Sequence, residues 1–132
     1  MGTPSRSERS LQKAKDLQHS IILHICSSTA WAATKNGNGE FRCPSLDSEG
    51  FIHCSTPDQV VGVANYLFRG QCGLVLLVID PQSVVPSIRY EDAGNGKLYP
   101  HIYGLLNVNA VVGVEAFKPS ADGTFQLPAR LT

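Results

Sequence analysis

The sequence predicts a small α+β domain with two short helices, both in the N-terminal half, and mostly strands after them. Strand-like apolar stretches recur along the chain, whereas only two segments have helical spacing. The first strand is not followed by a Gly-x-Gly-x-x-Gly turn, and helices do not alternate regularly with strands. The pattern therefore argues against a doubly wound dinucleotide-binding fold.

Length and charge set limits on the function. The chain has 132 residues, enough for one hydrophobic core and too few for two. Its 11 Lys and Arg residues balance 11 Asp and Glu residues, and no basic patch stands out beyond the N-terminal tail. Duplex nucleic acid is therefore not expected as a partner, whereas a small-molecule ligand is.

Cysteine usage and hydropathy predict a soluble, cytoplasmic protein without a membrane partner. No apolar run approaches the roughly 20 residues that span a bilayer, and the first 20 residues have no signal-peptide core. The cysteines have irregular spacing without a Cys-x-x-Cys pair, which favours reduced thiols over disulfides. They are Cys26, Cys43, Cys54 and Cys72.

We expect three regions along the chain. Residues 1–19 are rich in Ser, Arg, Lys and Gln and are predicted to be a flexible tail. Residues 20–118 are predicted to form the single α+β domain. Residues 119–132 are expected to be a weakly ordered C-terminal end.

The N-terminal half is predicted to begin with a strand and a helix. Residues 21–26 form an apolar strand with His24 in its middle, where an unpaired polar group is costly. A serine cap then begins a short helix, which ends at an Asn- and Gly-rich turn over residues 36–39. A short strand at residues 40–42 and a loop at residues 44–47 follow.

A strand and a helix meet in the stretch from residue 49 to 59, around which the chain is organised. Its first half has a glycine start and then apolar residues without helical spacing, which predicts a short strand. Thr56 and Gln59 have the spacing of a capping box, and Pro57 falls at the first helical position. The spacing of apolar residues predicts a helix over residues 57–69.

Side-chain alternation makes this strand a candidate site. Phe51, His53 and Ser55 share one face, and Ile52 and Cys54 share the other. With Ile52 and Cys54 packed inward, an imidazole and a hydroxyl lie near a helix N-terminus, which favours phosphate or carboxylate. The alternative is a half-buried His53 that bonds to a backbone carbonyl.

The C-terminal half is predicted to contain strands only. Residues 74–79 are apolar on both faces, which predicts a central strand covered from both sides. Residues 88–91 alternate between polar and apolar side chains. Residues 98–103 follow a Gly-rich turn, and Pro100 predicts an edge or irregular strand there. The last strong strand lies at residues 111–115.

Polar side chains share faces on these later strands as well. Arg89 and Glu91 lie on one face of their strand, and Tyr99, His101 and Tyr103 lie on one face of the next. Together with the two histidine-bearing strands, they suggest a cleft, provided that the faces converge. Arginine suits a pyrophosphate, aromatic rings suit nicotinamide or adenine, and histidine suits a ribose hydroxyl.

Three sets of segments resemble the family called domain of unknown function 952, over about residues 21–117. They are Ile22-Leu23-His24-Ile25; Pro44-Ser45-Leu46-Asp47 with Gly50-Phe51-Ile52-His53-Cys54-Ser55; and Arg89-Tyr90-Glu91-Asp92 with Pro100-His101-Ile102-Tyr103-Gly104. The family's name does not supply an activity.

That family is more distantly similar to the ADP-ribosyltransferase fold, which includes poly(ADP-ribose) polymerases and the tRNA 2′-phosphotransferase. The resemblance implies a split, mainly antiparallel β-core, NAD as a ligand, and transfer of an ADP-ribosyl or phosphate group. His24 matches the position that binds the adenosine ribose, and Phe51 or His53 matches the one that stacks on nicotinamide. Glu91 or Glu115 would be the catalytic carboxylate.

The predicted site combines these positions. The catalytic candidates are Glu91 and His53, and the ligand-binding candidates are His24, Phe51, Ser55, Arg89, Tyr99, His101 and Tyr103. NAD or an ADP-ribose-like nucleotide is the predicted ligand.

Two alternatives belong to other classes. One is a non-catalytic ligand-binding or interaction domain, which keeps the pocket without the chemistry. The other is a metal-dependent hydrolase with zinc held by His24, His53 and His101. Cys54 is not expected to be a nucleophile activated by His53, because neighbouring strand residues point to opposite faces.

Overall fold

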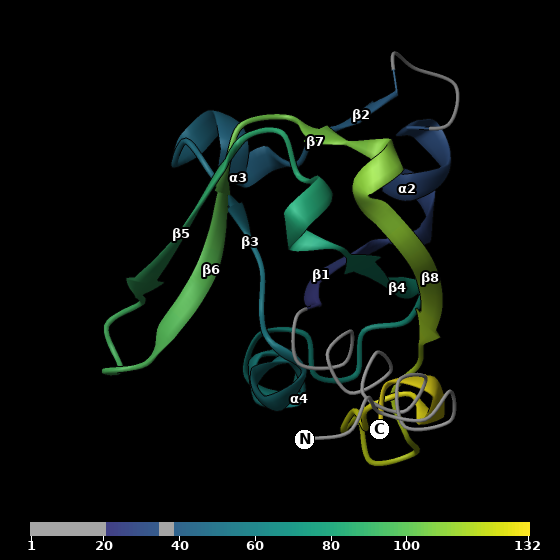
Figure 1. The fold of residues 1–132 in the computed structure, drawn as a ribbon. Helices are drawn as coiled ribbons and strands as arrows, with labels where there is room; N and C mark the ends of the chain where they lie inside the picture. Colours follow the sequence, from purple (N-terminus) through teal and green to yellow (C-terminus); the bar gives the residue numbers. More distant parts are fainter. Residues whose placement is uncertain (1–20, 35–38) are drawn as a thin grey trace, which may run out of the picture.

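The computed structural model describes residues 21–34 and 39–132, and it shows a small α+β domain (Figure 1). In chain order its elements are β1 (Ile22–Ser27), α2 (Ser28–Thr34), β2 (Glu40–Phe41), α3 (Pro44–Ser48), β3 (Ile52–His53), α4 (Pro57–Leu67), β4 (Leu74–Ile79), β5 (Ser87–Asp92), β6 (Leu98–Tyr103), β7 (Leu106–Asn107) and β8 (Val111–Phe117). The predicted tail at residues 1–19 and most of the predicted turn at residues 36–39 lie outside the described residues.

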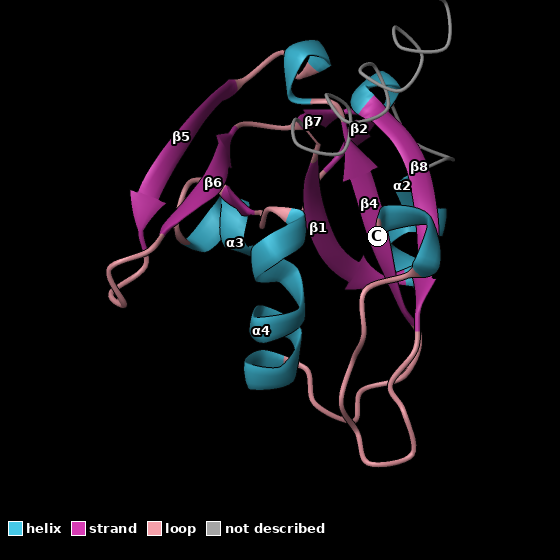
Figure 2. Ribbon diagram, turned by 60° about the horizontal axis from the view of Figure 1, so that its bottom comes forward, coloured by secondary structure: helices cyan, strands magenta, loops and turns pink. Residues whose placement is uncertain are grey.

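The described strands form three antiparallel sheets. Two have three strands each, in the orders β1-β4-β8 and β3-β6-β5, and β2 pairs with β7. Figure 2 shows α4 between the β5–β6 hairpin and the β1-β4-β8 sheet. The prediction of an α+β domain with a mainly antiparallel β-core is confirmed. Within the described residues, no helix is long and apolar enough to cross a membrane.

Two apolar clusters cover the two faces of β4, which confirms that it is a central strand. The first lies between the two larger sheets and includes Leu77 and Ile79 of β4 with Ile52 and Ile102 of the other sheet. The second, on the opposite face of β4, includes Leu76 together with residues of α4 and the C-terminal segment. Alternation along the strand divides its residues between these clusters.

Helix α4 begins as its sequence predicts. Thr56 accepts a hydrogen bond from the N3 backbone, Gln59 accepts one from the Thr56 backbone at 3.1 Å, and Pro57 is the first helical residue. The capping box pairs amide groups that a helix start leaves unsatisfied. The helix ends at Leu67, two residues before the predicted end.

The described residues contain three α-helices, so the prediction of two was wrong. The additional helix is α3, where a loop was predicted. Its five residues are too few to show a helical period, but Pro44 suits the first turn of a helix and Arg42 pairs with Asp47 across it. The backbone N–H of Glu49 closes the turn on the carbonyl of Ser45.

The prediction of an edge position for β6 was also wrong, because β6 is the central strand of its sheet. The N–H of Cys54 donates to the carbonyl of Pro100, and in an antiparallel pair the return bond would come from the N–H of residue 100. Proline has no such donor. The pairing of β3 with β6 covers only Ile52 and His53, so the missing donor falls where β3 leaves the sheet.

The segment expected to be a weakly ordered end packs onto the domain. Phe125 and Leu131 are buried in the second cluster, where Phe125 lies 4.7 Å from the ring of Phe117. The side chain of Asn65 on α4 accepts a hydrogen bond from the Phe125 backbone at 2.7 Å. Burial of these apolar side chains supplies the free energy that holds the segment in place.

Candidate functional site

The two larger sheets meet edge to edge and then diverge. Leu23 of β1 and Ser55, just after β3, exchange both backbone hydrogen bonds, at 2.7 and 2.8 Å. They form an isolated bridge, and beyond it the two strands separate. We call the region where β1 and β3 separate the fork.

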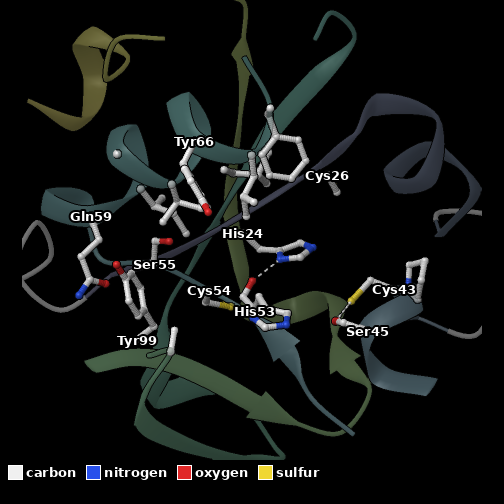
Figure 3. Close-up of a pocket in the computed structure, with 18 of the residues that line it drawn as sticks. His24, Cys26, Cys43, Ser45, His53, Cys54, Ser55, Gln59, Tyr66 and Tyr99 are labelled. Atoms are coloured by element: carbon white, nitrogen blue, oxygen red, sulfur yellow. Dashed lines mark hydrogen bonds between the residues drawn. The ribbon is translucent and has the colours of Figure 1, made fainter. Parts of the chain in front are cut away.

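The side chain of His24 occupies the fork (Figure 3). Its Nδ1 lies 2.6 Å from the backbone carbonyl oxygen of His53, which only accepts, so Nδ1 carries the proton. Burial lowers the pKa of His24 to about 4, while the hydrogen bond to His53 opposes the shift. The imidazole is therefore neutral at pH 7, and Nε2 is an acceptor with no hydrogen bond to any described residue.

A cleft of about 1120 Å³ opens at the fork. It extends between α4, the start of α3 and the turn of the β5–β6 hairpin. The polar and thiol side chains among its lining residues come from five parts of the chain: His24, Cys26 and Ser27; Arg42, Cys43 and Ser45; His53, Cys54 and Ser55; Asp58, Gln59 and Tyr66; and Asn95, Lys97 and Tyr99.

A second group of polar and aromatic side chains lies on the face of the β3-β6-β5 sheet that points away from the first apolar cluster. Alternation places Ile52 and Ile102 in that cluster and their neighbours on the other face. We call this group the outer-face cluster. It consists of Phe51, His53, Arg89, Glu91, His101 and Tyr103.

Glu91 is the hydrogen-bonding centre of the outer-face cluster. Its Oε1 accepts from the Tyr103 hydroxyl at 2.5 Å and from Nδ1 of His101 at 3.0 Å. The hydrogen bond from Tyr103, and after it the one from His101, lowers the pKa of Glu91. The bond between Tyr103 and Glu91 also raises the pKa of Tyr103. Nε2 of His101 is the one buried side-chain nitrogen or oxygen without a hydrogen-bond partner in the described part of the chain.

Ring contacts hold the rest of the outer-face cluster together. Phe51 stacks on His101 with centroids 4.1 Å apart, and the Arg89 guanidinium lies 4.4 Å above the Tyr103 ring. The ring centroids of His53 and His101 are 5.2 Å apart, and Nε2 of His53 lies 2.5 Å from Oε2 of Glu49. The side chain of His53 is 51% exposed, so it is not a core histidine. Among the described residues its ring is bonded to the Glu49 carboxylate and not to a backbone carbonyl.

The structure brings the predicted site residues together in two groups, not one. His24, His53, Ser55 and Tyr99 line the cleft. The remaining five do not line it and belong to the outer-face cluster: Phe51, Arg89, Glu91, His101 and Tyr103. His53 belongs to both groups.

The other glutamate considered, Glu115, is remote from His24. On β8 it pairs with Leu76, whose side chain is in the second apolar cluster, whereas His24 faces the first. Its carboxylate lies 3.9 Å from Arg130. Its place on β8 therefore puts it on the face of the sheet opposite to the side chain of His24.

The sequence analysis did not assign two residues of α4 that line the cleft, Gln59 and Tyr66. The signal was present, because they lie seven residues apart and therefore on one face of the helix. Asp58 was missed as well, and it is the only carboxylate among the described residues that line the cleft.

The described residues show neither a cluster of metal ligands nor an activated thiol at Cys26 or Cys54. No group of three His, Cys, Asp or Glu side chains is placed to hold a metal ion in residues 21–34 and 39–132. Burial raises the pKa of the Cys54 thiol and raises that of Cys26 to about 12, so both thiols are protonated at neutral pH. Protonated buried thiols are poor nucleophiles.

These features define a class: a small antiparallel α+β domain with a cleft at the fork between two sheets. The chain belongs to the family described as "Protein of unknown function (DUF952)", whose model matches residues 25–114. Among curated proteins, none matches the chain.

Solved structures of one bacterial protein are similar to this chain. Two crystal structures of protein CC0527 from Caulobacter crescentus, one of them of a double mutant, superpose with a TM-score of 0.76 at 33% sequence identity. The match covers 84% of this chain and 97% of that one. A solution NMR structure of CC0527 gives a TM-score of 0.72 at 33% identity, with 82% and 93% covered.

Proposed function

We propose that this protein binds NAD or an ADP-ribose-like nucleotide in the cleft at the fork. The observation that carries the proposal is His24, a neutral imidazole with a fixed tautomer in the wall of a large cleft. The cleft volume of about 1120 Å³ lies just above the roughly 300–1,000 Å³ range of ligand pockets. A dinucleotide needs a site of this size.

The chemistry of His24 selects a hydrogen-bond donor. Because Nδ1 donates to the His53 carbonyl, Nε2 accepts, and the low pKa keeps the ring uncharged. The pyrophosphate of a dinucleotide is fully ionised at neutral pH and has no donor to offer, whereas a ribose hydroxyl has one. The ribose of the nucleotide is therefore the part that we assign to His24.

A likeness to the ADP-ribosyltransferase fold is part of this proposal. It is supported by the two antiparallel sheets that separate at a fork and by a histidine on the first strand that faces the cleft. Similar structures can have different chemistry, so the site and not the fold has to decide the activity.

Binding without group transfer is the function that the geometry supports best. Departure of nicotinamide leaves a cationic ribosyl centre, which a catalytic site stabilises with a fixed carboxylate. Glu91 is held by Tyr103 and His101 in the outer-face cluster and does not line the cleft. Asp58 does line it, but its side chain is exposed and no described residue fixes it by a hydrogen bond. We therefore propose a binding domain and not a transferase.

Isothermal titration with NAD, ADP-ribose and nicotinamide tests the proposal. We expect wild-type protein to bind NAD and ADP-ribose, and His24→Ala to bind them about 3- to 10-fold more weakly, the effect of one hydrogen bond. Tyr90→Ala, on β5 and outside the cleft, is the control that should leave binding unchanged, and circular dichroism verifies that both variants fold. The absence of both heat and a thermal shift with all three ligands at millimolar concentration would overturn the proposal.

The same samples separate a binder from an enzyme. We expect no nicotinamide release from NAD, alone or with cell lysate as a source of acceptors. Release by wild-type protein that is lost in Glu91→Gln would make the protein an enzyme and Glu91 its carboxylate.

A further inference from the structure

We infer that the cleft holds a purine ring flat against α4, in a slot between Gly62 and Tyr66 of the helix and Tyr99 of β6. The inference rests on the proposed nucleotide binding and adds where the base of the nucleotide lies. It depends on the face that α4 presents to the cleft, on the glycine in that face, and on the tyrosine opposite.

One face of α4 lines the cleft, and Asp58 in the first turn of the helix is its only charged residue there. Its residues have the spacing i, i+3, i+4 and i+7 of a single helix face, and none of them is buried: Gln59, Gly62, Val63 and Tyr66. The opposite face carries Val60 and Ala64, which are buried in the second apolar cluster. A helix face in contact with water alone is normally polar or charged, whereas Gly62 and Val63 at the centre of this face are neither.

The packing of the described residues does not require a glycine at position 62. It lies inside α4, and a Cβ built on it would meet no atom within 4 Å. Glycine destabilises a helix interior relative to alanine, so a glycine that no neighbour requires is unexpected there. It does leave a bare strip of helix backbone on the cleft side, over which a flat ring can approach closely.

The opposite wall of the slot is held in place by hydrogen bonds. Nε2 of Gln59 donates to the carbonyl of Leu98 at 2.8 Å, which ties α4 to β6 directly beside Tyr99. Nδ2 of Asn95 donates to the Tyr99 hydroxyl at 2.9 Å and orients that ring. The separation of the helix from Tyr99 is therefore set by contacts already present.

Tyr66 is available to a ligand. Its side chain extends from α4 toward Ser55 and His24 (Figure 3), and the residue is 87% exposed. Aromatic rings stack on nucleobases and tolerate any base, because every base has a π-face. Tyr66 and Tyr99 are the two tyrosines among the described residues that line the cleft.

The charge distribution favours an uncharged purine over a cationic ring. Neither the four residues of the helix face nor Tyr99 is charged. The charged groups at this end of the cleft, Asp58 and Lys97, are exposed at its rim. Lys97 suits the phosphate that a purine nucleotide carries, since its ammonium group donates to phosphate oxygens.

The test compares two ligands that differ only in the base. AMP and ribose 5-phosphate are titrated into wild-type protein, Gly62→Ala and Tyr66→Ala, with Tyr90→Ala as the control. Tyr90 is a 53% exposed tyrosine on β5 that does not line the cleft. We expect Gly62→Ala and Tyr66→Ala to weaken AMP binding about 10-fold or more, and Tyr90→Ala to leave it unchanged.

Binding of ribose 5-phosphate is expected to be weaker than that of AMP and equal in all four proteins. Thermal unfolding provides the folding control, because alanine is the better helix former and Gly62→Ala should raise Tm. Weaker AMP binding by a more stable variant cannot come from unfolding. A lower Tm for Gly62→Ala would contradict the open space above this glycine and overturn the inference.

Two further outcomes distinguish this inference from the proposed function. Wild-type protein that binds AMP, with Gly62→Ala and Tyr66→Ala binding it equally well, overturns the slot and leaves nucleotide binding intact. Wild-type protein that binds neither AMP nor NAD nor ADP-ribose overturns both.

Discussion

Replacement of Leu76 by alanine should lower the free energy of unfolding by about 3–4 kcal/mol. Leu76 lies in the middle of β4, is fully buried, and belongs to the second apolar cluster with Val60 of α4 and Phe125 of the C-terminal segment. The change removes three carbon atoms, worth about 2.4 kcal/mol at about 0.8 kcal/mol each. The cavity that remains between the sheet and α4 adds a further cost of about 1 kcal/mol.

His53→Ala provides the contrast. Half of the side chain is exposed, and its ion pair with Glu49 is at the surface. Such a pair contributes about 0–1 kcal/mol, so His53→Ala should cost far less than Leu76→Ala.

Urea unfolding followed by circular dichroism measures both variants, and an unchanged slope of free energy against urea makes the midpoints comparable. Equal losses for Leu76→Ala and His53→Ala would refute the exposed position of His53 at the cleft. A loss below about 1 kcal/mol for Leu76→Ala would refute the packing of the second cluster.

Three further predictions concern other parts of the molecule. Phe125→Ala should destabilise the protein by about 3–5 kcal/mol in the same urea assay, because its ring is buried against Phe117. An unchanged free energy of unfolding would show that the C-terminal segment is not part of the core. Glu91→Gln should lower the pKa of Tyr103 toward its ordinary value in an ultraviolet titration, since the carboxylate that accepts its proton and repels the phenolate is gone. His24 has a pKa of about 4 in the folded protein and 6.5 in the unfolded chain, so the unfolded chain binds a proton more tightly. The free energy of unfolding of the wild-type protein should therefore fall by ~3 kcal/mol as the pH drops from 6.5 to 4. His24→Phe should flatten that dependence, and a parallel fall in both proteins would contradict the burial of His24.

Local features of the sequence determined much of the fold. Apolar runs identified β1, β4 and β8. Alternation then showed which residues of a strand share a face, because a strand has only two faces. The capping box at Thr56 and Gln59 identified the start of α4, because it is made by residues three apart. Each of these signals comes from neighbours along the chain, so the sequence is sufficient to find it.

Features that depend on distant partners were decided only by the tertiary structure. Pro100 weakens a strand locally, yet β6 is central, because β3 leaves the sheet just where the missing donor would have been used. Nothing near Phe125 in the sequence indicates that its ring is buried, because its partners in the second cluster are distant along the chain. Both outcomes were set by residues tens of positions away in the sequence.

The candidate site shows the same division. The sequence by itself determined that Arg89 and Glu91 share a face and that Tyr103 belongs to a polar face of the next strand. It did not determine which sheet faces meet, because alternation relates the residues of one strand and not the packing of two sheets. Packing of the two sheets through Ile52 and Ile102 turned those polar faces outward, and the bridge at the fork left His24 inside the cleft.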